Sequence, residues 1–215
     1  MKKQHNTDSS DTEGRILDAA TDVIAQRGYS GAGIQEIVDL SGTSKGSFYF
    51  HFPSKEAMAF ALVESMSNRL VKKVQLSIRH EPTPLHRLVT SVDVLMATFG
   101  RQRKVAQVLL LNVIGHGKAT DKKFLPIRER FSSLIRDELD QAVNIGQIDP
   151  QDTSLLAEMW IGALHEVILR WLLREKSYSL VSKVPYLTAA LMKSVGAPSH
   201  FVENLTTVRV GDQIS

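Results

Sequence analysis

A short polar segment in the first quarter of the chain holds side chains suited to contact with DNA. Thr43 and Ser44 have hydroxyl groups that can cap a helix and donate hydrogen bonds to phosphate. Lys45 supplies a cation for a phosphate or a guanine edge, Gly46 permits close approach of the backbone, and Ser47 can contact a base edge. The segment therefore predicts an interface with double-stranded DNA.

Three side chains further along the chain extend this candidate interface. Tyr49 offers a hydroxyl group and an aromatic face. His51 and Lys55 are placed to hold phosphate, and Lys55 stands near a predicted helix N-terminus, where the helix dipole favours anions. We therefore expect the contacts with DNA to continue from the polar segment into the next helix.

Two short helices around a turn must position these side chains. Residues 33–52 predict a helix-turn-helix, in which the second helix enters the major groove by its N-terminal end. In the first helix we expect Ile34, Ile37 and Leu40 to face inward, and Gly42 to end it.

The second helix of this motif carries its own apolar pair. Phe48 and Phe52 are four residues apart, so they share one face, which we expect to be the core side. The polar residues between them are then left for the DNA side.

The rest of the chain also shows helical rather than strand periodicity, which predicts an all-α fold. A helix should begin near Ser10 and stop at Gly28. Further helices are expected at about 55–79, 84–99, 101–115, 121–145, 152–175 and 180–195, with a loose tail after them.

The stretch from Ile16 to Glu56 resembles the signature of the TetR/AcrR family of repressors. The resemblance is strongest in residues 42–56, which read Gly-Thr-Ser-Lys-Gly-Ser-Phe-Tyr-Phe-His-Phe-Pro-Ser-Lys-Glu, because the glycines, aromatic residues, His and Lys fall at family spacing. It implies a homodimer with an N-terminal DNA-binding domain and a variable ligand domain, in which ligand binding spreads the two recognition helices.

The resemblance also implies individual DNA contacts. The candidate set is Gln35, Thr43, Ser44, Lys45, Gly46, Ser47, Tyr49, His51 and Lys55. The amide of Gln35 could bridge N6 and N7 of an adenine. The chain departs from the family pattern at Ala32 and Gly33, where hydroxyl residues are usual, so the capping oxygen and one phosphate donor are missing there.

These observations predict a three-helix helix-turn-helix DNA-binding domain followed by a larger helical ligand-binding and dimerisation domain. The expected parts are a disordered arm (1–11), the DNA-binding domain (12–56), a linking helix (55–79), the second domain (57–196) and a C-terminal tail (197–215). The helix near 152–175 is apolar on more than one face, so it and the helix near 180–195 are the expected homodimer surface.

The second domain is expected to bind a small, mainly apolar effector between its helices. The segment Gly162-Ala-Leu-His-Glu166, followed by Trp171, is similar to ligand-domain helices of fatty-acid-responsive and drug-responsive family members. The candidate lining residues are Phe99, Val108, Leu111, Asn112, Phe131, Trp160, Leu164, His165 and Ile168. Each of them could instead be plain core.

Charge is distributed unevenly along the chain. Residues 1–60 carry six Lys/Arg and eight Asp/Glu, so the overall charge of this part does not argue for DNA binding. Residues 61–136 carry fourteen Lys/Arg against five Asp/Glu. The basic segment 101–123 is either a solvated surface or a site for an anionic effector such as a fatty acyl-CoA.

Several other classes of function find no support in the sequence. The chain has no cysteine, and it contains no nucleophile elbow, P-loop, dinucleotide glycine motif or HExxH, so we expect neither an enzyme nor a cofactor. His165 and Glu166 are adjacent and point to different helix faces, so no metal site is expected. The N-terminus has no apolar signal segment, and no apolar run could span a bilayer, which predicts a cytoplasmic protein without a membrane partner.

The sequence thus predicts a dimeric repressor that a small molecule releases from its operator. The alternative is a ligand-independent architectural DNA-binding protein or an activator.

Overall fold

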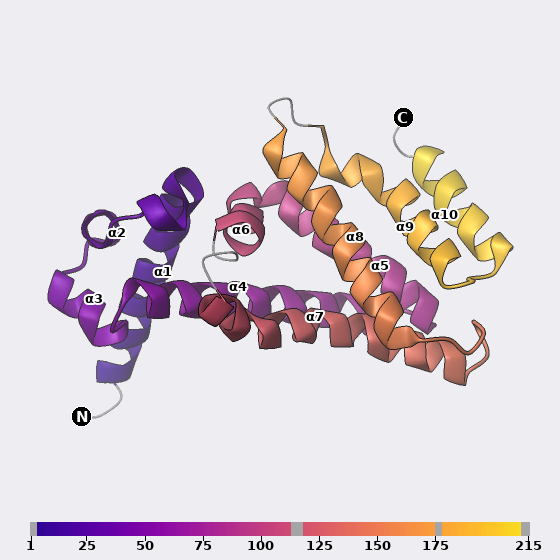
Figure 1. The fold of residues 1–215 in the computed structure, drawn as a ribbon, viewed down its shortest axis with the longest axis horizontal. Helices are drawn as coiled ribbons and strands as arrows, with labels where there is room; N and C mark the ends of the chain where they lie inside the picture. The colour runs from indigo at the N-terminus through magenta and orange to yellow at the C-terminus, as the bar shows by residue number, and fades with distance from the viewer. Residues whose placement is uncertain (1–3, 113–117, 175–177, 212–215) are drawn as a thin grey trace. The chain divides into compact units, whose positions relative to one another are not determined.

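The computed structural model describes the backbone of residues 4–112, 118–174 and 178–211, and the side chains of residues 11–110, 125–174 and 178–205. All regular elements in these ranges are helices, as predicted (Figure 1). In the described part of the chain, no helix is both long enough and apolar enough to cross a membrane.

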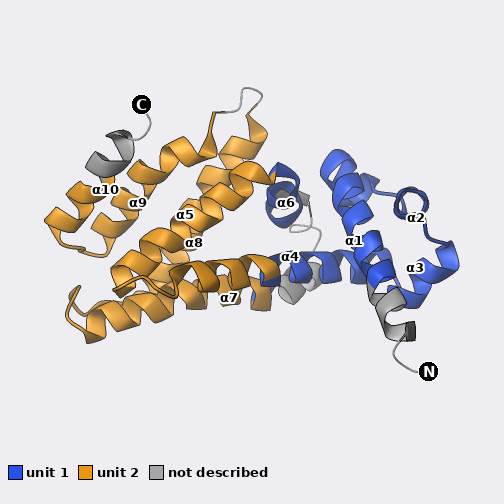
Figure 2. Ribbon diagram, turned by 180° about the vertical axis from the view of Figure 1, so that it is seen from behind, with its two compact units in different colours: residues 1–68, 103–125 blue, residues 69–102, 126–215 orange. Residues whose placement is uncertain are grey.

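The chain forms two compact units, which Figure 2 shows in separate colours. Unit 1 comprises residues 1–68 and 103–125, and unit 2 comprises residues 69–102 and 126–215. Helix α4 (Lys55–Ile78) contributes residues to both units.

Unit 1 is built around α1 (Gln4–Gly31), which supports α2 (Ile34–Ser41) and α3 (Lys45–His51). The buried face of α1 includes Ile16, Ala20 and Ile24, each fully buried, so their helical spacing forms the core side of this helix. The backbone of α1 departs from helical geometry at Gly28, where φ is 71°. The helix end predicted at Gly28 is therefore a kink within α1.

Unit 1 also contains a segment from much later in the chain. Helix α6 (Arg103–Gln107) and the π-helix η1 (Val108–Asn112) both contact α1. Lys104 Nζ of α6 lies 2.7 Å from Asp22 Oδ1 of α1. The predicted single helix at 101–115 is therefore two elements, and part of the predicted second domain lies with the DNA-binding helices because Ala106 and Val108 are fully buried there.

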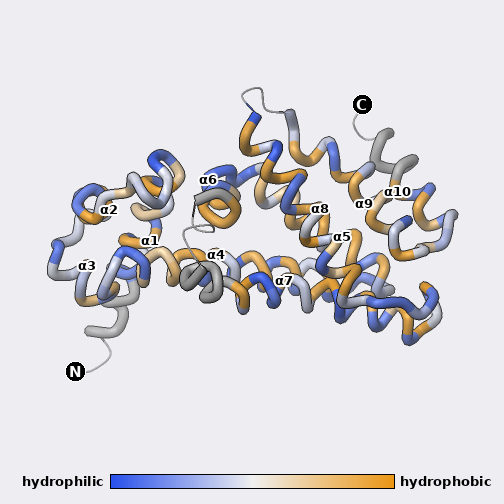
Figure 3. The backbone as a smooth tube through the Cα atoms, viewed as in Figure 1, coloured by the Kyte–Doolittle hydropathy of each residue, from blue (hydrophilic) through white to orange (hydrophobic). Residues whose placement is uncertain are grey.

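Unit 2 contains the remaining long helices. These are α5 (Pro84–Arg101), most of α7 (Lys118–Asn144), α8 (Thr153–Leu173) and α9 (Val184–Ser194), with the 3-10 turn η2 (Leu180–Lys183) before α9. Hydrophobic residues recur along α5 and α8 (Figure 3). Arg87 Nε of α5 donates to Glu138 Oε2 of α7 at 2.7 Å, and this largely buried ion pair ties the two helices together.

The two ends of the chain differ from the prediction. Residues 199–211, expected as a loose tail, form helix α10 (Ser199–Gly211), which contacts α9. Val202 is buried, and the Phe201 ring lies edge-on to His86 with the centroids 5.0 Å apart, so the helix is held by packing on unit 2. At the other end α1 begins at Gln4, within the segment expected to be disordered.

Candidate nucleic-acid interface and ligand cavity

The turn between α2 and α3 has the backbone geometry that its residues favour. Gly42 has φ 62° and ψ 31°, a left-handed conformation that costs glycine little. Ser44 is the N-cap of α3, and its Oγ accepts a hydrogen bond from the backbone nitrogen of Ser47 at 3.0 Å. The Thr43 and Ser41 hydroxyl groups lie 2.8 Å apart. The start of α3 is thus fixed by local hydrogen bonds.

Helix α3 has a buried face and an open face. Phe48 is fully buried and Phe52 nearly so, which confirms the predicted core side. Lys45, Gly46 and Tyr49 are exposed, and the Tyr49 ring is held edge-on against Phe48 with the centroids 5.4 Å apart. The aromatic pair therefore anchors α3 while its polar residues stay accessible.

Helix α2 contributes Gln35 to the same region of the motif. Gln35 is exposed, and its Nε2 donates to Asp39 Oδ1 one turn later at 2.8 Å. A carboxylate only accepts hydrogen bonds, so Asp39 fixes which end of the Gln35 amide it holds. The N-cap of α2 is Gly33, which makes no side-chain capping bond, as the missing hydroxyl predicted.

Lys55 is already engaged within the protein. Its Nζ donates to the carbonyl oxygen of Ser30 at 3.3 Å and lies 4.8 Å from the centroid of the Tyr29 ring. Burial lowers the pKa of Lys55. The pKa of Tyr29 is raised, first by burial and then by the negative charge of Glu56. Lys55 thus fastens the start of α4 to the end of α1.

Two exposed residues of unit 1, one on α1 and one on α3, were not in the predicted set. Arg15 of α1 reaches the turn, where its Nη1 lies 3.4 Å from the carbonyl oxygen of Ser41 while much of the side chain is exposed. Phe50 of α3 is 81% exposed. The sequence could have predicted this exposure. Phe50 is two residues from the core residue Phe48, and residues two apart in a helix point to nearly opposite sides.

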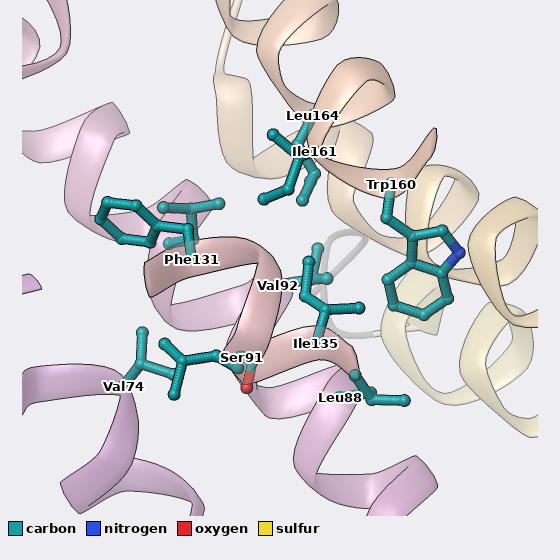
Figure 4. A pocket seen from close by; sticks show the side chains of 11 residues that line it. Val74, Leu88, Ser91, Val92, Phe131, Ile135, Trp160, Ile161 and Leu164 are labelled. Carbon is teal, nitrogen blue, oxygen red and sulfur yellow. The ribbon is translucent and has the colours of Figure 1, made fainter. Parts of the chain in front are cut away.

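Unit 2 contains a cavity of about 50 Å³ between α4, α5, α7 and α8 (Figure 4). Its lining is Val74, Leu88, Ser91, Val92, Leu95, Phe131, Leu134, Ile135, Trp160, Ile161 and Leu164. Ser91 is the only polar residue among them, and its hydroxyl donates to the carbonyl oxygen of Arg87 at 2.7 Å. Trp160 Nε1 donates to Ser194 Oγ at 3.1 Å and points away from the cavity in Figure 4. The cavity therefore offers hydrocarbon surface.

The predicted ligand residues are distributed unevenly. Phe131, Trp160 and Leu164 line the cavity. Phe99 and Ile168 are buried in unit 2 but do not line it, and His165, which is half-buried, does not line it either. Val108 lies in unit 1, buried with η1.

Some predicted positions lie outside the described residues. The side chains of Leu111 and Asn112 are among them, as are most of the lysines of the basic segment 101–123. Of the basic residues described there, Arg101 is exposed, Arg103 is half-buried and Lys104 is paired with Asp22. Among the described residues, no group of three or more His, Asp or Glu side chains could hold a metal ion.

The helix-turn-helix is matched directly by a family model. Residues 16–62 match the model for bacterial regulatory proteins of the tetR family. Residues 16–62 therefore form a helix-turn-helix domain of the tetR family. A curated relative of the chain is the fatty acid metabolism regulator protein of Bacillus subtilis (strain 168), 22% identical over 169 residues, which are 78% of this chain and 87% of the relative.

Solved structures show that the tetR fold extends through both units. FadR from Bacillus subtilis, in complex with stearoyl-CoA, has a TM-score of 0.79 at 21% identity, covering 82% of this chain and 96% of that chain. AibR, in complex with isovaleryl coenzyme A and operator DNA, has a TM-score of 0.69 at 19% identity, covering 83% and 97%. These structures indicate the fold, and the family match of residues 16–62 together with the curated relative indicates a DNA-binding transcription regulator with an N-terminal helix-turn-helix domain and a larger helical domain.

Proposed function

We propose that this regulator is a homodimeric repressor whose operator affinity falls when an acyl-coenzyme A places its acyl chain in the cavity of unit 2. The observation that carries the proposal is the apolar lining, whose one hydroxyl group is directed to its own helix. Such a surface favours a hydrocarbon chain over a polar ligand, because a buried polar group without a partner is costly. The ligands present in the FadR and AibR structures support this choice.

The size of the cavity implies that binding changes the protein. A volume of about 50 Å³ holds roughly two water molecules, whereas drug-sized ligands occupy pockets of about 300–1,000 Å³. An acyl chain must therefore move the lining helices apart. Val74 on α4 lines the cavity, and Lys55 begins the same helix, so a shift of α4 would reach the DNA-binding motif. The ligand needs only to favour the shifted state over the other.

An exposed apolar face supports the dimer. On α8, Leu155 and Met159 are more than half exposed, and Gly162, nearly one turn further on, has no atom near its position for a Cβ. On α9, Tyr186 and Ala190 are exposed with the same spacing. A stripe of large and small apolar residues on neighbouring helices suits close packing against a second copy. A dimer would present two recognition helices to half-sites about 34–36 Å apart.

The test measures operator binding by fluorescence anisotropy in the presence of acyl-CoA esters from isovaleryl to stearoyl. We expect at least one ester to weaken binding ten-fold or more, while coenzyme A and the matching free acid have much smaller effects. Equal effects of an ester and its free acid would contradict the proposal that the effector is an acyl-coenzyme A. No effect of any ester would favour the ligand-independent alternative, and increased transcription on binding would favour an activator.

A pair of variants ties the response to the cavity. Leu95 is half-buried and lines the cavity, so Leu95→Trp should fill it and abolish the response while leaving DNA binding intact. Val94 is also half-buried but does not line the cavity, so Val94→Trp is the matched control and should respond like the wild type. An unchanged response of Leu95→Trp would place the effector elsewhere.

A further inference from the structure

Phe50 is the most exposed of the large hydrophobic side chains in the described residues, at 81%. It lies near the end of α3, the second helix of the helix-turn-helix, within the residues that match the family model. A phenylalanine left in water forgoes the stabilisation that burial provides, and in this position the fold gains nothing from it. A contact made only in the complex with DNA accounts for such a side chain.

The position of Phe50 on α3 is central to the open face. Successive residues in a helix are separated by about 100°, so Phe50 points about 200° away from the buried Phe48. Gly46 is one turn earlier on the same side, and a Cβ there would meet only Ser44 Oγ, at 3.8 Å. The Phe50 ring is therefore the large side chain along the middle of this face, because the position one turn earlier is a glycine.

The chemistry of the major groove restricts what an aromatic ring can contact. Base edges there present hydrogen-bond donors and acceptors, and the apolar group among them is the C5 methyl of thymine. Phe50 has no polar atom, whereas the hydroxyl group of the adjacent Tyr49 can contact phosphate or a polar edge. We propose that Phe50 contacts a thymine methyl in each operator half-site and makes the protein select thymine there.

The His51 ring supports this role by holding the Phe50 ring. The two rings meet edge-on with their centroids 5.3 Å apart, which limits rotation of Phe50 before DNA is bound. The inference rests on the DNA-binding role of α3, but not on the effector or on repression.

The test uses duplexes that the full-length wild-type protein enriches from a random double-stranded library. Each thymine of the best duplex is replaced in turn by deoxyuridine, which lacks only the C5 methyl group, and the dissociation constant is measured by fluorescence anisotropy. For the wild type we expect one thymine in each half-site whose replacement weakens binding about four-fold, the factor for removing one buried methyl group. Phe50→Ala should bind equally to thymine and uracil at that position.

The controls separate this contact from other effects of truncation. Leu76→Ala removes another exposed apolar side chain (51%), which lies in unit 2, so it should keep the uracil sensitivity of the wild type. Phe50→Leu should keep part of it. Thermal unfolding of Phe50→Ala should match the wild type because the side chain has little packing to lose.

Two results would overturn the inference. The first is a wild type that tolerates uracil at every thymine, and the second is a Phe50→Ala variant with the same sensitivity as the wild type. A uniform loss of affinity without methyl dependence would show that Phe50 packs on sugar or phosphate. If the wild type enriched no duplex, the DNA-binding role itself would fail, which is a different outcome.

Discussion

Lys55 is bound within the protein before any DNA is present. The hydrogen bond to Ser30 and the position over the Tyr29 ring fix its ammonium group at the start of α4. A cation held in this way loses less side-chain freedom on meeting a phosphate than a free surface lysine. At the scale of single residues, the same contacts hold the start of α4 to the end of α1 and fix the ammonium group for the proposed phosphate contact.

Lys55→Ala should weaken DNA binding and reduce its dependence on salt. Loss of one phosphate contact lowers the slope of log affinity against log salt concentration by about one unit per subunit. The slope is measured by titrations at several salt concentrations. Lys72→Ala, an exposed lysine of α4 within unit 2, is the control and should leave the slope unchanged. Equal slopes for wild type and Lys55→Ala would remove Lys55 from the interface.

Tyr29→Phe should change how stability depends on pH on the alkaline side of pH 10. The pKa of Tyr29 is raised in the folded protein, so the unfolded chain, with a pKa of about 10, releases this proton first. Above pH 10 the loss of this proton from the unfolded chain therefore lowers the free energy of unfolding of the wild type. The Tyr29→Phe variant lacks this decrease. Urea denaturation between pH 8 and 11 measures it, with Tyr49→Phe as the control. A wild-type decrease equal to that of Tyr29→Phe would contradict the prediction.

Single-residue predictions from the sequence were sound where apolar spacing was strong and weaker at the edges of faces. Phe48 and Phe52 are buried as expected, but Leu40, expected inward, is 56% exposed, and Val38 is buried beside Ile37 instead. A helix as short as α2 has a narrow apolar face, and tertiary packing decides its rotation. The DNA contacts and the effector contacts remain predictions.

At the scale of elements, the sequence predicted best the helices with clear stop signals. Gly42 ends α2 and Ser44 begins α3, where caps and a left-handed glycine are visible in the residues themselves. The segment 101–115 was predicted as one helix because its division into α6 and η1 depends on packing against α1. Helix α10 was missed because Gly196 and Pro198 before it indicate an ending rather than a new start.

Two glycines in unit 1 should respond in opposite ways to alanine. Gly42→Ala places a side chain at φ 62°, so unit 1 should lose about 1–2 kcal/mol of stability and α3 should lose its fixed start. Gly14 lies inside α1 with no atom within 4 Å of its Cβ position, so Gly14→Ala should gain about 0.5–1 kcal/mol. Chemical denaturation compares the two. A gain for Gly42→Ala would mean that this turn tolerates other geometries.

At the scale of the whole molecule, solvent-exposed apolar residues gather at places with separate proposed roles. Phe50 belongs to the proposed DNA face, and Leu155, Met159 and Tyr186 belong to the proposed dimer face. The sequence predicted the second surface from the two-sided apolar pattern of α8. It predicted two domains but did not place α6 and η1 in the first of them, because these elements join α1 across about eighty residues of chain.

Leu155→Arg should dissociate the dimer while leaving each protomer folded. An unpaired charge buried in an interface costs about 3–5 kcal/mol, enough to produce monomers at micromolar concentration. Sedimentation velocity reports the change, and affinity for a full operator should fall with it. Leu76→Arg, at a similarly exposed leucine of unit 2, should remain dimeric. A dimeric Leu155→Arg would show that the partner binds another face.

The contact of Lys104 with Asp22 also has a consequence for protein synthesis. A ribosome adding about 5–20 residues per second makes α1, α2 and α3 several seconds before it makes α6 and η1. During that interval the part of α1 that later contacts α6 and η1 has no partner. The DNA-binding unit is therefore finished late, and a fragment ending near residue 80 would lack part of its own core.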